Sequence, residues 1–201
     1  MSIGFDQSTS EGSTSKFIRV SPETAIDGGR YIKELETGVL ESGAAWLQCT
    51  VRDENGATAN KRWFEPTMGG YIDDDKKLKT AQNKIIKIVA NLVRRFKGAE
   101  YVITGAPTFK EFFDRAVKAV KETPNWDKKE LRVFVVNGKP TDDGAKFPTL
   151  PNFAPIFEDI SVNPTKMKIT EYHDVEAWSG DSTTPDDDGA APGETTETVS
   201  W

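Results

Sequence analysis

Residues 44–66 read AAWLQCTVRDENGATANKRWFEP, and this stretch predicts a β-hairpin. The run Trp46–Val51 alternates Trp, Gln and Thr with Leu, Cys and Val, the period of two expected when a strand shows different faces to core and solvent. Asn55 and Gly56 both accept a positive φ, so this pair is typical of a hairpin turn. Residues 60–64 (NKRWF) then return as the second strand, which ends before Pro66.

Two helices are expected after the hairpin. Residues 73–98 begin with three aspartates, which suit the N-cap and the positive end of a helix dipole, and they end at Gly98. Residues 107–124 begin with Thr108 and Glu111 in a capping box and end at Pro124. Apolar residues recur at helical spacing in both ranges, so one stripe of each helix is expected to be buried.

The other segments carry shorter patterns. Residues 27–31 (DGGRY) follow Pro22 and predict a turn or a flexible loop. Residues 130–139 (ELRVFVVNGK) contain a nearly continuous apolar run, typical of a buried strand. Further strands are expected within residues 16–20, at the start of residues 146–160 and within residues 166–178. The whole pattern predicts an α+β fold that is mainly β.

The composition favours one folded domain with tails, since the chain has 201 residues and a mass of 22.3 kDa. No apolar run approaches the roughly 18 residues of a membrane-spanning helix, and residues 1–17 lack the pattern of a secretory signal. A single cysteine, Cys49, and a single histidine, His173, argue against a disulfide framework and a Cys/His zinc site. We expect Cys49 to be buried, His173 to be exposed, and the protein to be cytoplasmic without membrane contact.

Charge is distributed unevenly along the chain. The net charge is −6, yet residues 171–201 contain nine acidic residues and no Lys or Arg, which leaves 26 basic against 23 acidic residues in 1–170. A basic body with an acidic tail points to a polyanionic ligand, although a tail that only improves solubility explains the charge equally well. We expect a disordered segment at 1–15, a folded domain at 16–178 and a flexible acidic tail at 179–201.

The tail combines acidic residues with an aromatic ring at its last position. Such a segment can occupy a cationic groove until DNA displaces it, because both compete for the same charges. Once displaced, the terminal ring and carboxylate can anchor in pockets of other proteins. The tail residues expected to act in this way are Asp186, Asp187, Asp188, Glu194, Glu197 and Trp201.

Basic and aromatic residues alternate on the predicted strands. Single-stranded nucleic acid is held by cations that follow its phosphates and by rings on which its bases stack. Aromatic residues also build the cores of small barrels; we expect Trp63 and Tyr71 to be exposed platforms, and Phe64 and Phe134 to be core residues. The candidate nucleic-acid-binding residues are Trp46, Lys61, Arg62, Trp63, Tyr71 and Arg132.

Catalytic motifs are not evident. The sequence has no Walker-type phosphate loop, no GxGxxG after a strand and no Gly-x-Ser-x-Gly. The three aspartates at 73–75 resemble ligands of a hard cation, but helix capping explains them more simply. We therefore expect no enzymatic activity, no cofactor and no metal.

The order of these segments resembles the single-stranded-DNA-binding proteins of bacteriophages. The resemblance rests on the early hairpin, helices between strands, the strand LRVFVVNGK, the segment FPTLPNFAPIFE and an acidic tail that ends in an aromatic ring, and it covers residues 15–201 in outline. It implies an oligonucleotide/oligosaccharide-binding (OB)-like five-stranded Greek-key barrel with two inserted or flanking helices and disordered termini. One departure is the position of Asp186–Asp188, which lie well upstream of Trp201.

The resemblance also implies a function. A protein of this family coats and protects single-stranded DNA during replication, recombination and repair, in the host cytoplasm if the source is a virus. Its tail recruits replication or recombination proteins such as a polymerase, a helicase-primase or a nuclease. On the family's pattern, Lys61, Arg62 and Trp63 lie on the binding face, with Arg132 a neighbour.

Two other classes remain open from the sequence. A mid-sized α+β body with flexible termini would also suit a virion structural or assembly protein. A small nuclease or resolvase is less favoured, because the acidic residues of 1–170 occur mostly at turns and helix starts and are not paired along strands. The sequence leaves open whether the chain forms a homo-oligomer.

Overall fold

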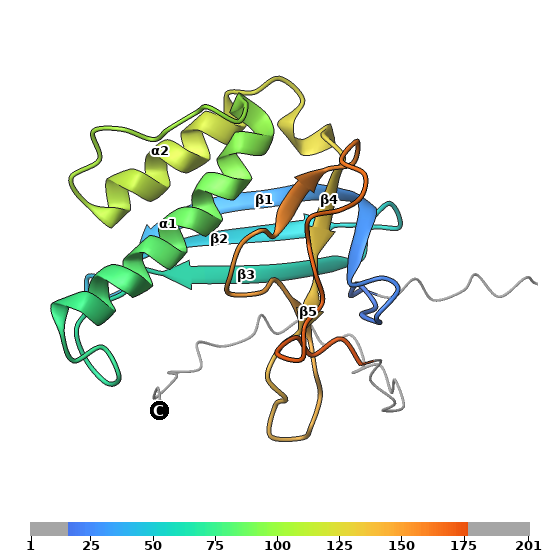
Figure 1. The fold of residues 1–201 in the computed structure, drawn as a ribbon, viewed down its shortest axis with the longest axis horizontal. Helices are drawn as coiled ribbons and strands as arrows, with labels where there is room; N and C mark the ends of the chain where they lie inside the picture. The colour runs from blue at the N-terminus through green and yellow to red at the C-terminus, as the bar shows by residue number, and fades with distance from the viewer. Residues whose placement is uncertain (1–15, 177–201) are drawn as a thin grey trace, which may run out of the picture.

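A computed structural model describes residues 16–176, which form a seven-stranded sheet and two α-helices (Figure 1). The sheet has the order β5-β6-β3-β2-β1-β4-β7. Its strands are β1 (Ile26–Val39), β2 (Ala45–Arg52), β3 (Thr58–Phe64), β4 (Leu131–Phe134), β5 (Val136–Asn137), β6 (Pro148–Thr149) and β7 (Phe157–Asp159). The helices are α1 (Asp75–Lys97) and α2 (Phe109–Lys121), followed by the 3-10 turn Trp126–Lys128. The expected α+β class, mainly β, is confirmed.

The predicted hairpin forms β2 and β3, which pair antiparallel from Arg52↔Thr58 to Trp46↔Phe64. Its connection is longer than a two-residue turn, because the Asp53 amide donates to the Ala57 carbonyl at 2.9 Å and closes a five-residue loop. Gly56 supplies the positive φ of 85° in this loop.

The longest strand, β1, was not expected from the sequence, where residues 27–31 predict a turn or loop. The two glycines at 28 and 29 lie inside the strand, and Gly29 has a φ of 68°. A register shift between Ile32 and Glu34 adds one extra residue, Lys33, as in a β-bulge. This extra residue breaks the period of two, and the sequence pattern therefore hides the strand.

The sheet curls strongly because successive parts of β1 pair with different strands. Its first residues pair with β4 and the remainder with β2, both antiparallel. At the other end of the strand order, β3 pairs in parallel with β6, which pairs with β5. Only Val135 separates β4 from β5 in the chain, so the segment from 131 to 137 links one end of the curled sheet to the other.

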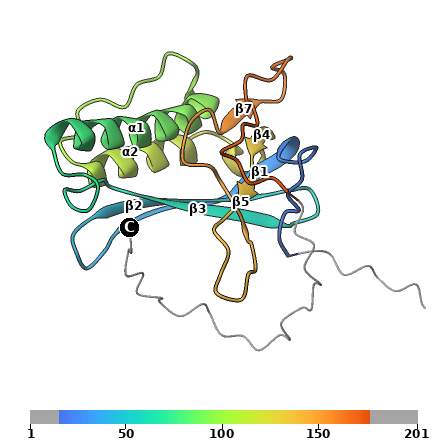
Figure 2. The same ribbon diagram turned by 60° about the horizontal axis from the view of Figure 1, so that its bottom comes forward.

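Both helices begin and end as the sequence predicts. The Asp74 side chain caps α1 by accepting from the Lys77 amide, and the Gly98 amide donates to the Arg94 carbonyl. Thr108 caps α2 by accepting from the Glu111 amide. Helices α1 and α2 form a layer over one face of β1–β3, and Figure 2 shows that no helix of residues 16–176 covers the opposite face. The buried stripe of α1 is Ile88, Val89, Leu92 and Val93, and that of α2 is Phe113, Ala116, Ala119 and Val120.

The expected last strand within residues 166–178 is wrong for the described part, which contains no strand after β7. Residues 166–176 instead run as irregular chain, anchored by the buried side chains of Met167 and Val175. His173 is also buried, so its expected exposure is wrong, whereas Cys49 is fully buried as expected. The expected strand at 16–20 is reduced to a single bridge between Phe17 and Thr58.

Candidate nucleic-acid interface

The uncovered face of β1–β3, called the open face below, is defined by the register of the hairpin. Leu47, Cys49 and Val51 are fully buried toward the helices, so the alternate residues of β2 point to the other side. Residues paired across an antiparallel ladder share a face. The residues of β2 and β3 on the open face are therefore Trp46, Gln48, Thr50, Arg52, Thr58, Asn60, Arg62 and Phe64.

Trp46 and Arg62 form a stacked unit on the open face, toward the end of the hairpin that lies away from its loop. The guanidinium carbon of Arg62 lies 4.3 Å from the centroid of the Trp46 ring. Gln48 holds the guanidinium in place, because its Oε1 accepts from Nε at 3.0 Å and from Nη2 at 2.8 Å. On β1, Gly38 pairs with Trp46, and a Cβ at Gly38 would lie 2.3 Å from the indole Cζ2. Only glycine at 38 leaves room for the ring in this position.

A second arginine and four more rings extend the layer. The Arg52 guanidinium carbon lies 4.8 Å from the centroid of the Tyr31 ring on β1. Phe17 bridges to Thr58, a residue of the open face, and its ring meets that of Phe147 edge-on with 5.3 Å between centroids. Phe17, Phe64 and Phe147 are 40%, 41% and 47% exposed. The open face thus carries several partly exposed rings together with two arginines.

Two loops flank the open face. Residues 40–44 join β1 to β2, and residues 138–147 join β5 to β6. In Figure 2, the β5–β6 loop extends away from the helices, on the side of the open face. This loop carries Lys139 and Lys146, and Lys146 pairs with Asp174 at 2.5 Å. Cations therefore lie beside the rings and on the adjoining loop.

The charge of the open face is mixed across its width. Glu36 pairs with Gln48, and Glu34 pairs with Thr50, so the β1 side carries carboxylates where the β2–β3 side carries guanidinium groups. A polyanionic backbone is attracted to the β2–β3 side and repelled from the β1 side. The positive charge of the open face is therefore concentrated along β2 and β3.

Of the six candidate residues, the structure brings Trp46 and Arg62 together on the open face. The expectations for Trp63 and Phe64 are wrong: Trp63 is 2% exposed in the core, while Phe64 is 41% exposed. The cause is the loop, since a two-residue Asn55-Gly56 turn would pair Leu47 with Phe64, whereas the five-residue loop pairs Leu47 with Trp63. A shift of one residue moves every side chain of a strand to the other face.

The remaining three candidates lie away from this unit. Lys61 pairs with Cys49 and so shares the helix-facing side with Trp63. Tyr71 is exposed as expected, at 60%, but it belongs to the loop between β3 and α1. Arg132 on β4 is held by Glu158 Oε2 and the Val162 carbonyl, both at 2.8 Å, and β1 separates it from the hairpin. The six tail candidates lie outside the described residues.

Several residues of the open face were not expected from the sequence: Tyr31, Arg52, Phe17, Phe147, and Phe64 as an exposed ring. Arg52 and Phe64 follow from the alternation of the hairpin once its register is known. Tyr31, Phe17 and Phe147 join them only through pairing between distant segments. Local pattern carries no signal for that pairing.

Metal sites and membrane spans are absent from the described part of the chain. Residues 16–176 contain no group of three or more His, Cys, Asp or Glu side chains that could hold a metal ion. No described helix has the length and apolar character needed to cross a membrane. A scan against protein-family models finds no match to the chain, and a search of curated proteins finds none either.

Proposed function

We propose that this protein binds single-stranded DNA through the open face, with little sequence preference and without enzymatic activity. The observation that carries the proposal is the layer of partly exposed rings and two arginines on a sheet face that no helix of the described residues covers. Stacking on aromatic rings suits every base, since each base has a π face. Arginines beside the rings supply contacts to phosphates.

Each side chain of the β2–β3 half has a distinct role in this proposal. Phe64 is the exposed platform on which a base stacks. Arg62 offers a guanidinium plane above Trp46, and bases stack on such planes as they do on rings. Arg52 lies at the other end of the face and contacts the backbone of the strand. Duplex DNA binds more weakly, because its bases are already stacked and paired.

We also propose that the curled sheet is an OB-like barrel. The supporting features are β1, which pairs with both β2 and β4, and the parallel pairing of β3 with β6. Helices α1 and α2 are inserted between β3 and β4. Barrels of this class bind oligonucleotides on the face of their second and third strands and through two flanking loops, which here correspond to the open face and its loops.

In the cell, such a protein would coat transient single strands in replication, recombination and repair. The acidic residues 186–197 and Trp201 would then recruit replication or recombination proteins, since an acidic segment with an aromatic anchor suits a basic pocket with an apolar floor.

The test is a fluorescence-anisotropy titration of the full chain against labelled oligo-dT and a matching duplex, at low and high salt. The variant Phe64→Ala removes the platform and should lose about 1–3 kcal/mol of binding free energy, or roughly 5- to 150-fold in affinity. Tyr172→Ala is the matched control, because Tyr172 is 82% exposed and lies in the segment after β7, not on β1–β3.

The expected result is salt-dependent binding to oligo-dT, weaker binding to the duplex, and a loss of affinity in Phe64→Ala alone. Absence of binding to oligo-dT at low salt would reject the proposed function and favour a structural or assembly role. Equal losses in both variants would place the nucleic acid elsewhere on the molecule.

A further inference from the structure

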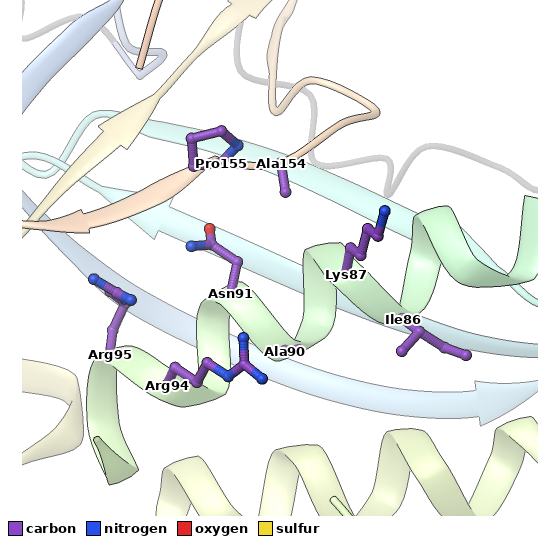
Figure 3. Close-up of a pocket in the computed structure, with 8 residues that line it drawn as sticks. All are labelled: Ile86, Lys87, Ala90, Asn91, Arg94, Arg95, Ala154 and Pro155. Atoms are coloured by element: carbon purple, nitrogen blue, oxygen red, sulfur yellow. The ribbon is translucent and has the colours of Figure 1, made fainter. Parts of the chain in front are cut away.

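A shallow hollow lies between α1 and the segment that leads into β7, on the helical side of the molecule. Its volume is about 420 Å³, within the range of about 300–1,000 Å³ typical of small-ligand sites. Ile86, Ala90, Ala154 and Pro155 form its apolar part, and Lys87, Arg94 and Arg95 supply its cations. Figure 3 shows Lys87 and Asn91 pointing from α1 toward the segment that carries Ala154 and Pro155.

The polar groups of the hollow differ in how far they are already satisfied. Asn91 is fully engaged, because its Oδ1 accepts from the amides of Ile156 and Phe157 and its Nδ2 donates to the Phe157 carbonyl. Arg95 is paired with Asp159 at 3.2 Å. Within residues 16–176, Lys87 and Arg94 have no carboxylate partner, and both are exposed. Arg94 donates from Nε to the Tyr101 carbonyl at 3.3 Å, which leaves its charge without a counter-ion in the described residues. Two cations beside an apolar surface are therefore available to a ligand.

The surrounding helix strengthens this positive field. Asp75 is the only acidic residue of α1, against eight Lys and Arg residues. Only Lys77 and Arg95 of these eight form ion pairs in the described part of the chain. An anionic ligand is attracted along the whole helix, and an apolar group on that ligand is retained where Ile86 and Pro155 are exposed.

The chemistry of the hollow fits an acidic peptide that carries an aromatic side chain. Its apolar part is aliphatic and offers no ring on which a base would stack, which disfavours nucleic acid. The chain itself contains such a segment, since residues 177–201 combine six acidic residues with two tryptophans, Trp178 and Trp201, and have no Lys or Arg. We propose that residues 177–201 bind in cis to this hollow, with the indole of Trp201 on the apolar part and the carboxylates facing Lys87 and Arg94.

Reach and local concentration support an occupant from the same chain. Twenty-five residues follow Glu176 and span at most about 80–90 Å when extended, whereas a folded domain of this size has a radius of gyration of roughly 15 Å. Attachment to the domain raises the local concentration of the segment to the order of millimolar, so even weak contacts are occupied.

The sequence alone predicts that the tail occupies the DNA-binding groove. The hollow beside α1 is a different site. On the open face, Arg52 and Arg62 already stack on rings, and Glu34 and Glu36 on β1 repel carboxylates. On α1, the cations are more numerous and mostly without an ion-pair partner in the described residues. The tail and single-stranded DNA then bind opposite sides of the sheet, so the inference does not depend on the proposed function.

The test compares ¹H–¹⁵N correlation spectra of the full chain and the full-length variant Trp201→Ala. Expected are shifts of the amide signals of residues 86–95 and Ala154, unchanged on dilution. In a Lys87→Glu/Arg94→Glu background these differences should be lost. In the matched control Lys76→Glu/Lys79→Glu, which makes the same charge change on exposed residues of α1 outside the hollow, they should persist.

Urea unfolding of both double variants checks that the exposed substitutions leave the fold intact. Shifts confined to residues 46–48 and 62–64 would overturn the inference by placing the tail on the open face. Shifts that grow with protein concentration would assign the hollow to the tail of a second copy, and would also overturn it. The inference also fails if the Trp201→Ala substitution shifts no amide signals. It fails as well if added oligo-dT shifts the amide signals of residues 86–95 in the Trp201→Ala variant, because the hollow would then bind nucleic acid.

Discussion

Trp46 is held on the open face by three neighbours that act through different forces. Gly38 has no side chain, and the indole occupies the space that a Cβ at this position would fill. Arg62 contributes a cation–π contact, worth about 0.5–1 kcal/mol at an exposed site. Gln48 fixes the guanidinium by accepting from two of its nitrogens. These contacts hold the unit in one arrangement, which would lower the entropic cost of the proposed DNA binding.

Replacing Gly38 with alanine should displace the Trp46 ring. The added Cβ would lie 2.3 Å from Cζ2 and 2.5 Å from Cε2, so the ring has to move or the strands have to separate. We expect a loss of about 1–3 kcal/mol of stability, the usual cost of overpacking. Urea unfolding of Gly38→Ala, Trp46→Ala and the double variant measures this cost.

The double variant separates the clash from other effects of the substitution. If the clash with Trp46 is the cause, Gly38→Ala should cost much less in the Trp46→Ala background, which gives a coupling free energy of the same size. Additive effects in the two single variants would show instead that alanine disturbs β1 itself.

Among the elements, the segment 166–176 is the least regular part of the described fold, and His173 is central to its packing. The imidazole lies between two phenylalanine rings, with centroids 4.5 Å from Phe134 and 4.7 Å from Phe153. Its Nδ1 accepts from the Thr170 amide at 2.9 Å, while Nε2 is buried and has no hydrogen-bond partner within residues 16–176. Burial lowers the pKa of His173, because it disfavours the charged imidazolium.

This environment predicts a loss of stability on mild acidification. Because the folded pKa of His173 lies below the ordinary value of 6.5, the unfolded chain binds the proton more readily than the folded chain. The stability that the neutral imidazole provides is fully present above pH 6.5 and declines as pH falls below that value toward the folded pKa. Urea unfolding at a series of pH values from about 8 to about 5 measures the decline.

The variant His173→Asn is the control for this pH dependence. Its Oδ1 can accept the Thr170 amide in place of Nδ1, but the side chain does not titrate, so its stability should be flatter between about pH 7 and pH 5. Carboxylates affect a lower range: burial alone would raise the pKa of Glu158, but hydrogen bonds from Lys166, Thr165 and Arg132 lower it below 4.5. Identical pH profiles for the two proteins would exclude His173 as the cause.

Across the domain, the curled sheet depends on the junction where β1 leaves β4 and continues along β2. Arg30 lies at this junction and is 3% exposed. Its guanidinium donates to the carbonyls of Thr24, Ala25 and Val133, so one side chain ties the turn before β1 to β4. Burial lowers the pKa of Arg30, and the carboxylates of Asp27 and Asp53 act in the opposite sense.

We expect Arg30→Met to lower the free energy of unfolding by about 3 kcal/mol or more. Three carbonyls lose a charged donor, and hydrogen bonds to charged groups contribute about 1.5–3 kcal/mol each, although such effects are not additive. Arg30→Lys should recover only part of the loss, because a compact ammonium lacks the planar fork of the guanidinium.

Thermal and urea unfolding of the wild type and the two variants measure this effect. The decisive outcome is the order of stability, with Arg30→Lys between the wild type and Arg30→Met. If Arg30→Met were as stable as the wild type, the junction would be held by strand pairing alone, and Arg30 would have no structural role in closing the sheet.

Local signals in the sequence are enough to establish the α+β class, both helices with their caps, and the existence of the β2–β3 hairpin. The Asp74 and Thr108 caps act within one helical turn, and the alternation of Trp46–Val51 is a property of one strand. The same signals predict Trp46 and Arg62 as candidate nucleic-acid-binding residues, because a predicted hairpin places this ring and this basic residue on paired strands.

Which rings face solvent and which segments pair depends instead on tertiary contacts. Trp63 and Phe64 exchange places through a shift of one residue, set by a hydrogen bond across residues 53–57. The long strand β1 forms despite its glycines and its bulge because β2 and β4 supply its hydrogen-bond partners. Arg132 and His173 are fixed by contacts to residues 26 and 39 positions away in the chain. Such pairings form between segments that are distant in the sequence, and the residue pattern within one segment does not specify its partner.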